Sequence, residues 1–184
     1  MKKFFSNPAV ALLIAVLVVC SSVLLNTRIK FGSRCEAVSD RFYNTLSGEA
    51  SIADSLRSFC ATAEKLVLIG EQYDIDAAED AGDSIGSIMS ALREESHDIG
   101  AIYDDYDRLL KEVFTLESAL ARENLSESDA ATYASLQHDA ADAKAAIDQS
   151  TYNDVVRSFQ KQYRRFPTPQ LAALSGVVYP ALFD

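Results

Sequence analysis

The chain of 184 residues carries 17 basic and 27 acidic side chains, a formal net charge of −10, and 48% of its residues are hydrophobic. All the acidic residues lie from Glu36 onward, where only 12 basic residues accompany them and the formal charge is −15; this excludes a nucleic-acid partner, because non-specific binding requires basic side chains that neutralise phosphates. The length beyond the N-terminal apolar stretch, about 150 residues, fits one domain, and the lack of Trp with only 7 Gly and 4 Pro favours long helices.

The N-terminal segment predicts a membrane-spanning helix. No charged side chain lies at positions 4–27, and the stretch Pro8–Leu25 is almost wholly apolar and just long enough to span a bilayer. A secretory signal peptide is the alternative, because Lys2 and Lys3 precede an apolar core. We favour an uncleaved anchor, since no small-x-small cleavage pattern follows the core and Cys20 lacks the preceding small residue of a lipoprotein signal.

The charges on the two sides of the anchor do not decide its orientation. Two lysines and the α-amine before the apolar core balance three basic residues that follow it. We predict a single-pass protein of the cell membrane in which residues 1–34 are the anchor and its flanks and residues 35–184 are a helical bundle domain.

The apolar residues beyond the anchor recur at alternating spacings of three and four, which is typical of helices in a bundle or coiled coil. This predicts an all-α fold in which the transmembrane helix continues into an antiparallel bundle of about four long helices. The membrane helix continues into a stalk that Gly48 can end as a left-handed cap. The apolar seam of the stalk is Phe31, Cys35, Val38, Phe42 and Leu46.

The second predicted helix begins at a capping box formed by Ser51 and Asp54. The third is long and is capped by Asp74 or Asp76. Its seam keeps one phase and is interrupted only at Glu95, so we favour one helix over two, with a bend as the alternative. The two seams are Ile52, Leu56, Phe59, Ala63, Leu66, Gly70 and Tyr73, then Ala78, Ala81, Ile85, Ile88, Leu92, Ile99, Ile102, Tyr106, Leu109, Val113, Leu116 and Leu120.

A fourth helix is predicted after a turn at Asn124, with Ser126 at its N-terminus and acidic residues in its first turn. Its seam changes phase near Ser150, which indicates a stutter, and Pro167 ends it near residue 165. The seam is Tyr133, Leu136, Ala140, Ala143 and Ile147, then Tyr152, Val156, Phe159, Tyr163 and Phe166. Because the third and fourth helices are predicted to be long, the turn at Asn124 should extend about 30 Å beyond the shorter pair.

The C-terminal third carries a set of residues that resembles the LemA family. These residues are Tyr152, Asn153, Val156, Phe159, Phe166, Pro167, Leu171, Ala172, Gly176 and Phe183. Tyr133 and Leu136-Gln137 upstream, and a short membrane helix that leads into a helical bundle, are similar to the family as well. The resemblance covers the anchor and residues 105–184.

The N-terminal half departs from the family pattern. Phe42-Tyr43-Asn44 and Leu56-Arg57 stand where family members carry a Trp, a paired Arg and an Asn-Leu element. The resemblance implies a bacterial, membrane-anchored helical domain of the cell envelope without an accepted enzymatic activity.

No residue pattern predicts a catalytic, metal or cofactor site. The acidic stretch 74–83 superficially resembles a calcium loop, but Ala78 and Glu79 stand where that loop needs an oxygen ligand and a glycine. His97 and His138 have no second ligand at zinc spacing. The acids of Tyr103-Asp104-Asp105-Tyr106 lie off the apolar seam, as on a solvated face.

The spacing of Gly82 and Gly86, with Ser90, predicts close packing of helices.

Two classes of function remain. The first is a membrane-anchored scaffold or protein-interaction module, without enzymatic activity, that binds another envelope protein or a second copy of itself. The second is an accessory or regulatory factor for a membrane enzyme such as a protease, which requires a pocket formed by residues distant in sequence.

Counting the passes of the helices predicts that basic residues from both ends of the chain gather at the lipid surface. These residues are Arg28, Lys30, Arg34, Lys161, Arg164 and Arg165. We expect this basic collar to meet anionic head groups of the bilayer, while Leu171–Phe183 either packs on the base of the bundle or rests at the interface.

An antiparallel turn near residues 48–50 places Cys35 within one helical turn of Cys60. The pair is either a disulfide or two small buried hydrophobic residues. A bridge would close a loop of about 25 residues, stabilise the fold by roughly 3 kcal/mol and require an oxidising compartment. It therefore favours a bundle outside the cytoplasm, with a cytoplasmic bundle as the alternative.

Overall fold

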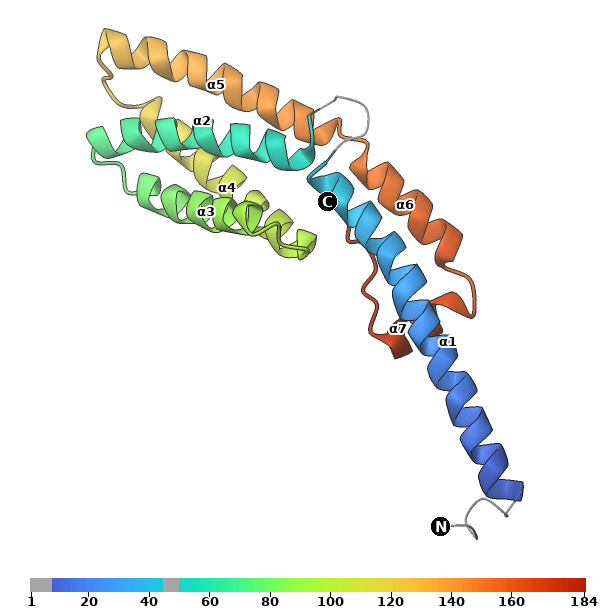
Figure 1. Cartoon of the computed structure of the whole chain (residues 1–184). Coiled ribbons are helices and arrows are strands. Elements are labelled where there is room, and N and C mark those ends of the chain that lie inside the picture. Colours follow the sequence, from blue (N-terminus) through green and yellow to red (C-terminus); the bar gives the residue numbers. More distant parts are fainter. Residues whose placement is uncertain (1–7, 45–49) are drawn as a thin grey trace. The chain divides into compact units, whose positions relative to one another are not determined.

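The computed structural model describes residues 8–44 and 50–184, and every regular element in these ranges is a helix (Figure 1). This confirms the predicted all-α class, with one long apolar helix at the N-terminus and a helical bundle. The elements are α1 (Pro8–Ser39), the short 3₁₀ helix η1 (Asp40–Phe42), α2 (Ile52–Gln72), α3 (Ala77–Arg93), α4 (Ile99–Leu120), α5 (Glu127–Asp148), α6 (Tyr152–Tyr163) and α7 (Thr168–Ser175).

The chain forms two compact units. We call residues 1–39 and 156–180 the anchor unit, and residues 40–155 and 181–184 the bundle unit. The boundary predicted at residue 35 thus falls near the end of α1, but residues 156–180 belong with α1 rather than with the bundle.

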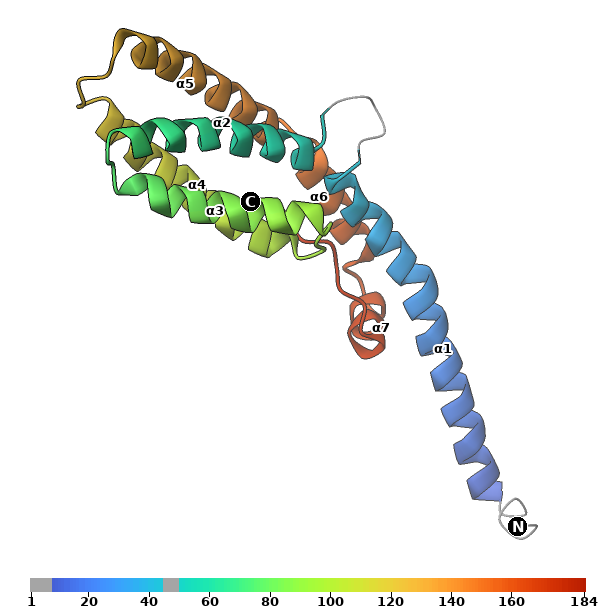
Figure 2. The same ribbon diagram turned by 60° about the vertical axis from the view of Figure 1, so that its left-hand side comes forward.

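The bundle unit is built around α2, which packs against α3, α4 and α5, while α3 also packs against α4 (Figures 1 and 2). These four helices have similar lengths, between 17 and 22 residues. Their buried faces are the predicted seams: the side chains less than 2% exposed include Leu56, Leu66, Ile88, Leu92, Ile99, Ile102, Leu109, Leu116 and Leu120.

The predicted long third helix is wrong, because the segment is a hairpin of α3 and α4. Glu95 has a left-handed backbone, with φ of 49°. The side chain of Asp98 then caps α4 by accepting a hydrogen bond from the Ala101 N–H at 3.1 Å. Leu92 and Ile99 are seven residues apart, which is the spacing of one continuous helix. The apolar pattern therefore gave no sign of the turn between them. The predicted 30 Å extension at Asn124 is therefore wrong as well.

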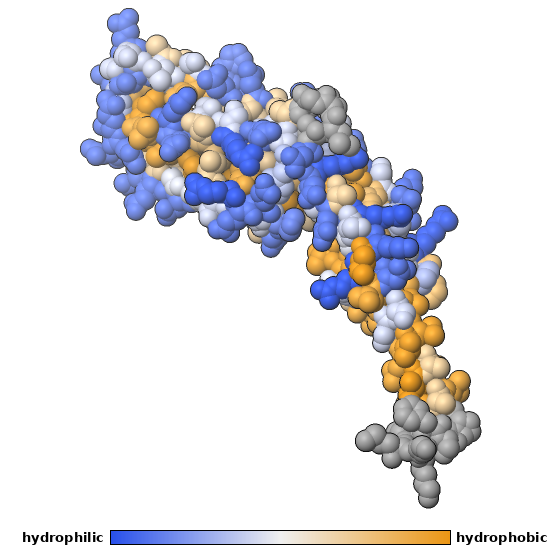
Figure 3. Space-filling model, viewed as in Figure 1, coloured by the Kyte–Doolittle hydropathy of each residue, from blue (hydrophilic) through white to orange (hydrophobic). Residues whose placement is uncertain are grey.

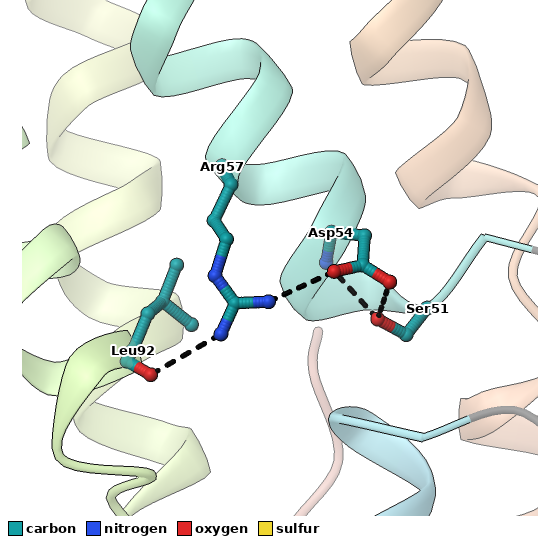
Figure 4. Close-up of polar contacts among 4 residues, drawn as sticks. All are labelled: Ser51, Asp54, Arg57 and Leu92. Atoms are coloured by element: carbon teal, nitrogen blue, oxygen red, sulfur yellow. Dashed lines mark hydrogen bonds and ion pairs between the residues drawn. The ribbon is translucent and has the colours of Figure 1, made fainter.

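The capping box predicted at Ser51 and the helix N-terminus predicted at Ser126 both have the expected serine cap. Ser51 Oγ accepts a hydrogen bond from the Asp54 N–H at 3.0 Å, and Ser126 Oγ accepts one from the Asp129 N–H at 3.1 Å. Figure 4 shows that Arg57 extends the first box, because it pairs with Asp54 at 2.8 Å and donates to the Leu92 carbonyl at 3.3 Å. This contact ties the start of α2 to the end of α3.

The cap predicted for the third helix is only partly confirmed. Asp76 is the N-cap of α3, but its side chain makes no capping hydrogen bond. Asp74 has a left-handed backbone, with φ of 55°, in the turn that connects α2 to α3.

The stutter predicted near Ser150 is a break between α5 and α6. Ser150 Oγ accepts a hydrogen bond from the Tyr152 N–H at 3.2 Å, at the start of α6. The helix then ends at Tyr163, before the prolines, and Pro167 is the N-cap of α7. The predicted single fourth helix is therefore two shorter ones, α5 and α6, and α7 is a further helix beyond its predicted end.

The close packing predicted at Gly82 and Gly86 is wrong, and Gly70 has that role instead. A Cβ atom added at Gly82 or Gly86 would meet nothing within 4 Å. One added at Gly70 would lie 2.7 Å from Leu116 Cδ1 and 3.1 Å from Ala78 Cβ. Gly70 therefore lets α2 approach its neighbours more closely than any larger residue would allow.

Candidate functional site

The surface of α1 is the first candidate site. Among the residues that the structure describes, only the stretch Ala9–Phe42 is long and apolar enough to cross a membrane, and none of its most apolar window is buried. Its mean hydropathy is 2.6 in that window, and Figure 3 shows hydrophobic residues along the visible face of α1. A signal sequence has the same properties, so the choice between an anchor and a signal peptide stays a prediction.

The last two turns of α1 pack against the C-terminal segment within the anchor unit. Phe31 is at the centre of this cluster: its ring centroid lies 5.9 Å from Phe159, 5.1 Å from Tyr163 and 5.4 Å from Tyr179. Cys35 and Ala172 complete the buried core. The stalk therefore shares its core with α6 and α7.

The structure places the whole predicted basic collar in the anchor unit. All six side chains are exposed: Arg28, Lys30, Arg34, Lys161, Arg164 and Arg165. Arg34 is held in place, because it donates to the Tyr163 hydroxyl at 2.5 Å and lies over the ring at 6.0 Å from its centroid. Within the described part of the chain, Lys161 and Arg164 form no ion pair.

The two units have opposite charges. The sequence of the anchor unit has nine basic residues and one acidic residue, a formal charge of +8. That of the bundle unit has eight basic and 26 acidic residues, a formal charge of −18. An anionic surface would attract the first unit and repel the second.

A groove of about 600 Å³ lies beside α6 in the anchor unit. Arg157, Lys161 and Arg164 line one part of it, and Gln160, Pro169 and Tyr179 line the rest. The sequence prediction included two of these cations and missed Arg157. The missed signal was the spacing of four and then three residues, which places all three on one face of a helix.

The chain around α7 leaves large apolar side chains in solvent. Phe166 is 81% exposed, Leu174 72% and Val178 83%. Ala172 and Phe183, in the same C-terminal stretch, are buried. Ala172 and Phe183 thus pack on the protein, whereas the predicted contact of residues 171–183 with a membrane interface stays a prediction.

The first two residues of the predicted family motif fasten the C-terminus within the bundle unit. Tyr152 donates a hydrogen bond to the Ala181 carbonyl at 2.9 Å. Asn153 donates to the Phe183 carbonyl and accepts from the Phe183 N–H, both at 2.8 Å. The Phe183 ring then packs against Phe42, Tyr103 and Tyr106, with centroids 5.2–5.6 Å apart.

The motif residues from Val156 to Gly176 lie in the anchor unit. Val156 and Phe159 are buried. Gly176 ends α7 in a left-handed conformation, with φ of 70°, which favours glycine. Phe166 and Pro167 precede α7, and the Phe166 ring is exposed.

The two cysteines of the predicted disulfide are buried free thiols, Cys35 in the anchor unit and Cys60 in the bundle unit. Burial, with a smaller contribution from the charge of Glu64, raises the pKa of the Cys60 thiol to about 12. Their pairing stays a prediction.

The residues considered as possible metal ligands or catalytic groups do not gather at one site among the described residues. Within the described residues no cluster of three His, Cys, Asp or Glu side chains could hold a metal ion. The acidic stretch after α2 lines a depression of about 520 Å³ that is open to solvent. His97 and His138 are exposed, and Asp105 is bound by Ser87 at 2.6 Å and Arg108 at 3.2 Å.

No protein-family model, curated protein or solved structure matches the chain. The resemblance to the LemA family therefore stays a prediction that rests on the motif residues.

Proposed function

We propose that the protein is a single-pass, membrane-anchored helical scaffold or protein-interaction module of the bacterial cell envelope. The observation that carries this proposal is the exposed apolar surface of α1, none of which is buried in its most apolar window. Leaving this area in water would be costly, whereas a bilayer buries it. The bundle then serves as a folded surface that the anchor holds at the membrane.

The proposed family is LemA. The motif from Tyr152 to Phe183 supports it, because Tyr152 and Asn153 hold the C-terminal segment by hydrogen bonds to Ala181 and Phe183 and Gly176 ends α7. We also propose that the protein binds another envelope protein, or a second copy of itself, and is not an enzyme.

Two apolar side chains of the bundle unit are suitable points for detecting a partner. Phe114 on α4 is 70% exposed and Leu68 on α2 is 60% exposed, whereas their neighbours in the seams are buried. Exposed large apolar side chains of this kind are common at protein interfaces.

The test is photocrosslinking in intact membranes from each of these positions. A photoreactive residue at 114 or 68 should give one discrete adduct, identified by mass spectrometry as an envelope protein or as the chain itself. A photoreactive residue at Ala134, an exposed small residue on α5, is the control. Adducts to a membrane protease would support the accessory-factor alternative, and adducts at no higher level than the control would contradict the proposal.

The proposed orientation places the bundle outside the cytoplasm. Because Cys35 and Cys60 are buried, labelling them reports poorly on topology. A Phe114→Cys variant supplies an exposed thiol instead. A membrane-impermeant maleimide should label it in intact cells, and labelling only after lysis would place the bundle in the cytoplasm.

A further inference from the structure

We infer that the anchor unit carries a second, peripheral lipid-binding site: the groove beside α6 binds the phosphate of an anionic phospholipid, and the apolar side chains around α7 enter the lipid layer. This inference rests on the proposed membrane anchor, and it adds a ligand class and a site that the anchor alone does not require.

The segment that contains α7 lies along α1 close to the end of its predicted apolar span. The predicted apolar span ends at Leu25, and α1 rises about 9 Å from there to Phe31, at roughly 1.5 Å per residue. The head-group layer of a bilayer is itself on the order of 5–7 Å thick on each side. The segment after α6 packs on α1 about 2–4 Å outside this layer, a distance that a large side chain can span, because Tyr179 lies against Phe31 and a Cβ on Gly32 would lie 3.8 Å from Val177.

The segment around α7 presents an apolar surface. Phe166, Leu174 and Val178 are each more than 70% exposed, although they flank or belong to a helix whose Ala172 is fully buried. Three large apolar side chains on one short stretch are unfavourable in water and favourable at the boundary between head groups and acyl chains.

The charge of the groove selects the ligand. Arg157, Lys161 and Arg164 line the groove beside Gln160 and Tyr179. Gln160 donates to the Pro180 carbonyl at 2.9 Å and Tyr179 donates to the Tyr163 carbonyl at 3.2 Å, so the cations are the groups that would bind a phosphate. Guanidinium and ammonium groups recognise phosphate oxygens. Residues 156–180 contain no acidic side chain, and Lys161 and Arg164 form no ion pair among the described residues.

Together these features favour a phospholipid over a free phosphate ion. A soluble anion would use the cations but leave the apolar side chains exposed. A lipid molecule satisfies both at once, with its phosphate in the groove and its acyl chains against α7 and α1.

The first arm of the test uses fluorescence of the full-length chain in bilayer nanodiscs of phosphatidylcholine and phosphatidylglycerol. Because the natural chain has no Trp, a Leu174→Trp variant has a single emitter. Lipids brominated on their acyl chains should quench it, as they should quench Leu12→Trp in the apolar part of α1. Phe114→Trp, at a similarly exposed site of the bundle unit, gives the level for a surface Trp.

Quenching of Leu12→Trp without quenching of Leu174→Trp above the Phe114→Trp level would overturn this inference and leave the anchor intact. Protection of Leu174→Trp from aqueous iodide without bromine quenching would show that protein, such as a second copy, covers α7. That result would overturn it too.

The second arm measures lipid adducts by native mass spectrometry of the full-length protein in detergent. The wild type should retain phosphatidylglycerol in preference to phosphatidylcholine. Lys161→Gln with Arg164→Gln should weaken the retention of phosphatidylglycerol by roughly 25-fold, since each cation near an anionic surface contributes roughly fivefold. Lys65→Gln with Arg122→Gln removes the same charge from the bundle unit and should change nothing.

Equal retention by the groove variant and the wild type would overturn the lipid site. Full displacement of the lipid by millimolar inorganic phosphate would also overturn it, because it would identify the ligand as the free ion.

Discussion

At the scale of single residues, Gly70 explains how α2 reaches its neighbours. Its missing Cβ leaves room for Leu116, which is fully buried, and for Ala78. Gly70→Ala should lower the free energy of unfolding by about 1–3 kcal/mol, because overpacking outweighs the better helix propensity of Ala. Gly86→Ala, where the added Cβ meets nothing, should instead raise it by about 0.5–1 kcal/mol. Thermal unfolding followed by circular dichroism checks both, and equal effects would contradict this account.

Asn153 is the residue that holds the C-terminus. Asn153→Ala removes both hydrogen bonds to Phe183 and leaves partly buried backbone groups unpaired, which should cost about 1–3 kcal/mol. Carboxypeptidase should then remove the last residues faster than from the wild type. Gln137→Ala removes an exposed hydrogen bond to Tyr133 and is the control. Unchanged digestion of the Asn153 variant would show that the aromatic cluster alone retains the tail.

The Cys60 thiol gives a test of burial by pH. Its pKa is raised from 9.0 to about 12 in the folded protein. Because the raised pKa favours the protonated form, this thiol stabilises the fold below pH 9 and its contribution is lost as the pH rises towards 12. The free energy of unfolding should therefore fall more steeply above pH 9 in the wild type than in a Cys60→Ala variant. Urea unfolding at a series of pH values measures it, and an equal pH dependence of the two proteins would contradict the raised pKa.

At the scale of elements, the sequence predicted which face of each helix is buried better than it predicted where each helix ends and the next begins. The caps at Ser51 and Ser126 were found because capping is local, and the seams were found because burial has a period. The α3–α4 hairpin was missed because Leu92 and Ile99 keep a heptad across the turn. The groove was missed in part because Arg157 was not considered with Lys161 and Arg164, and because its lining from Pro169 and Tyr179 depends on tertiary packing.

The hairpin can be tested by a disulfide between α3 and α4. Ser87 Oγ and Asp105 Oδ2 are 2.6 Å apart, whereas in one continuous helix the two residues would be separated by about 27 Å. In a background with Cys20, Cys35 and Cys60 replaced by Ala, Ser87→Cys with Asp105→Cys should oxidise rapidly to an intramolecular disulfide. Ser87→Cys with Asp104→Cys, whose second position is exposed, should oxidise more slowly. Failure of the first pair to crosslink would restore the single long helix.

At the scale of the whole molecule, the charge is divided between the two units. The anchor unit has a formal charge of +8 and the bundle unit one of −18. Salt should therefore weaken both the attraction of the anchor unit to an anionic bilayer and the repulsion of the bundle unit from it. The sequence made this division visible only in part, because the cations of residues 157–165 lie far along the chain from those of residues 28–34.

The central claim is that α1 remains part of the mature protein and holds it in the membrane. The most direct measurement is the intact mass of the protein in cell membranes washed with alkaline carbonate. We predict a membrane-bound species with the full-chain mass of 20.1 kDa. A shorter chain that lacks the apolar segment and is found in the carbonate supernatant would show that the segment is a cleaved signal peptide and would contradict the claim.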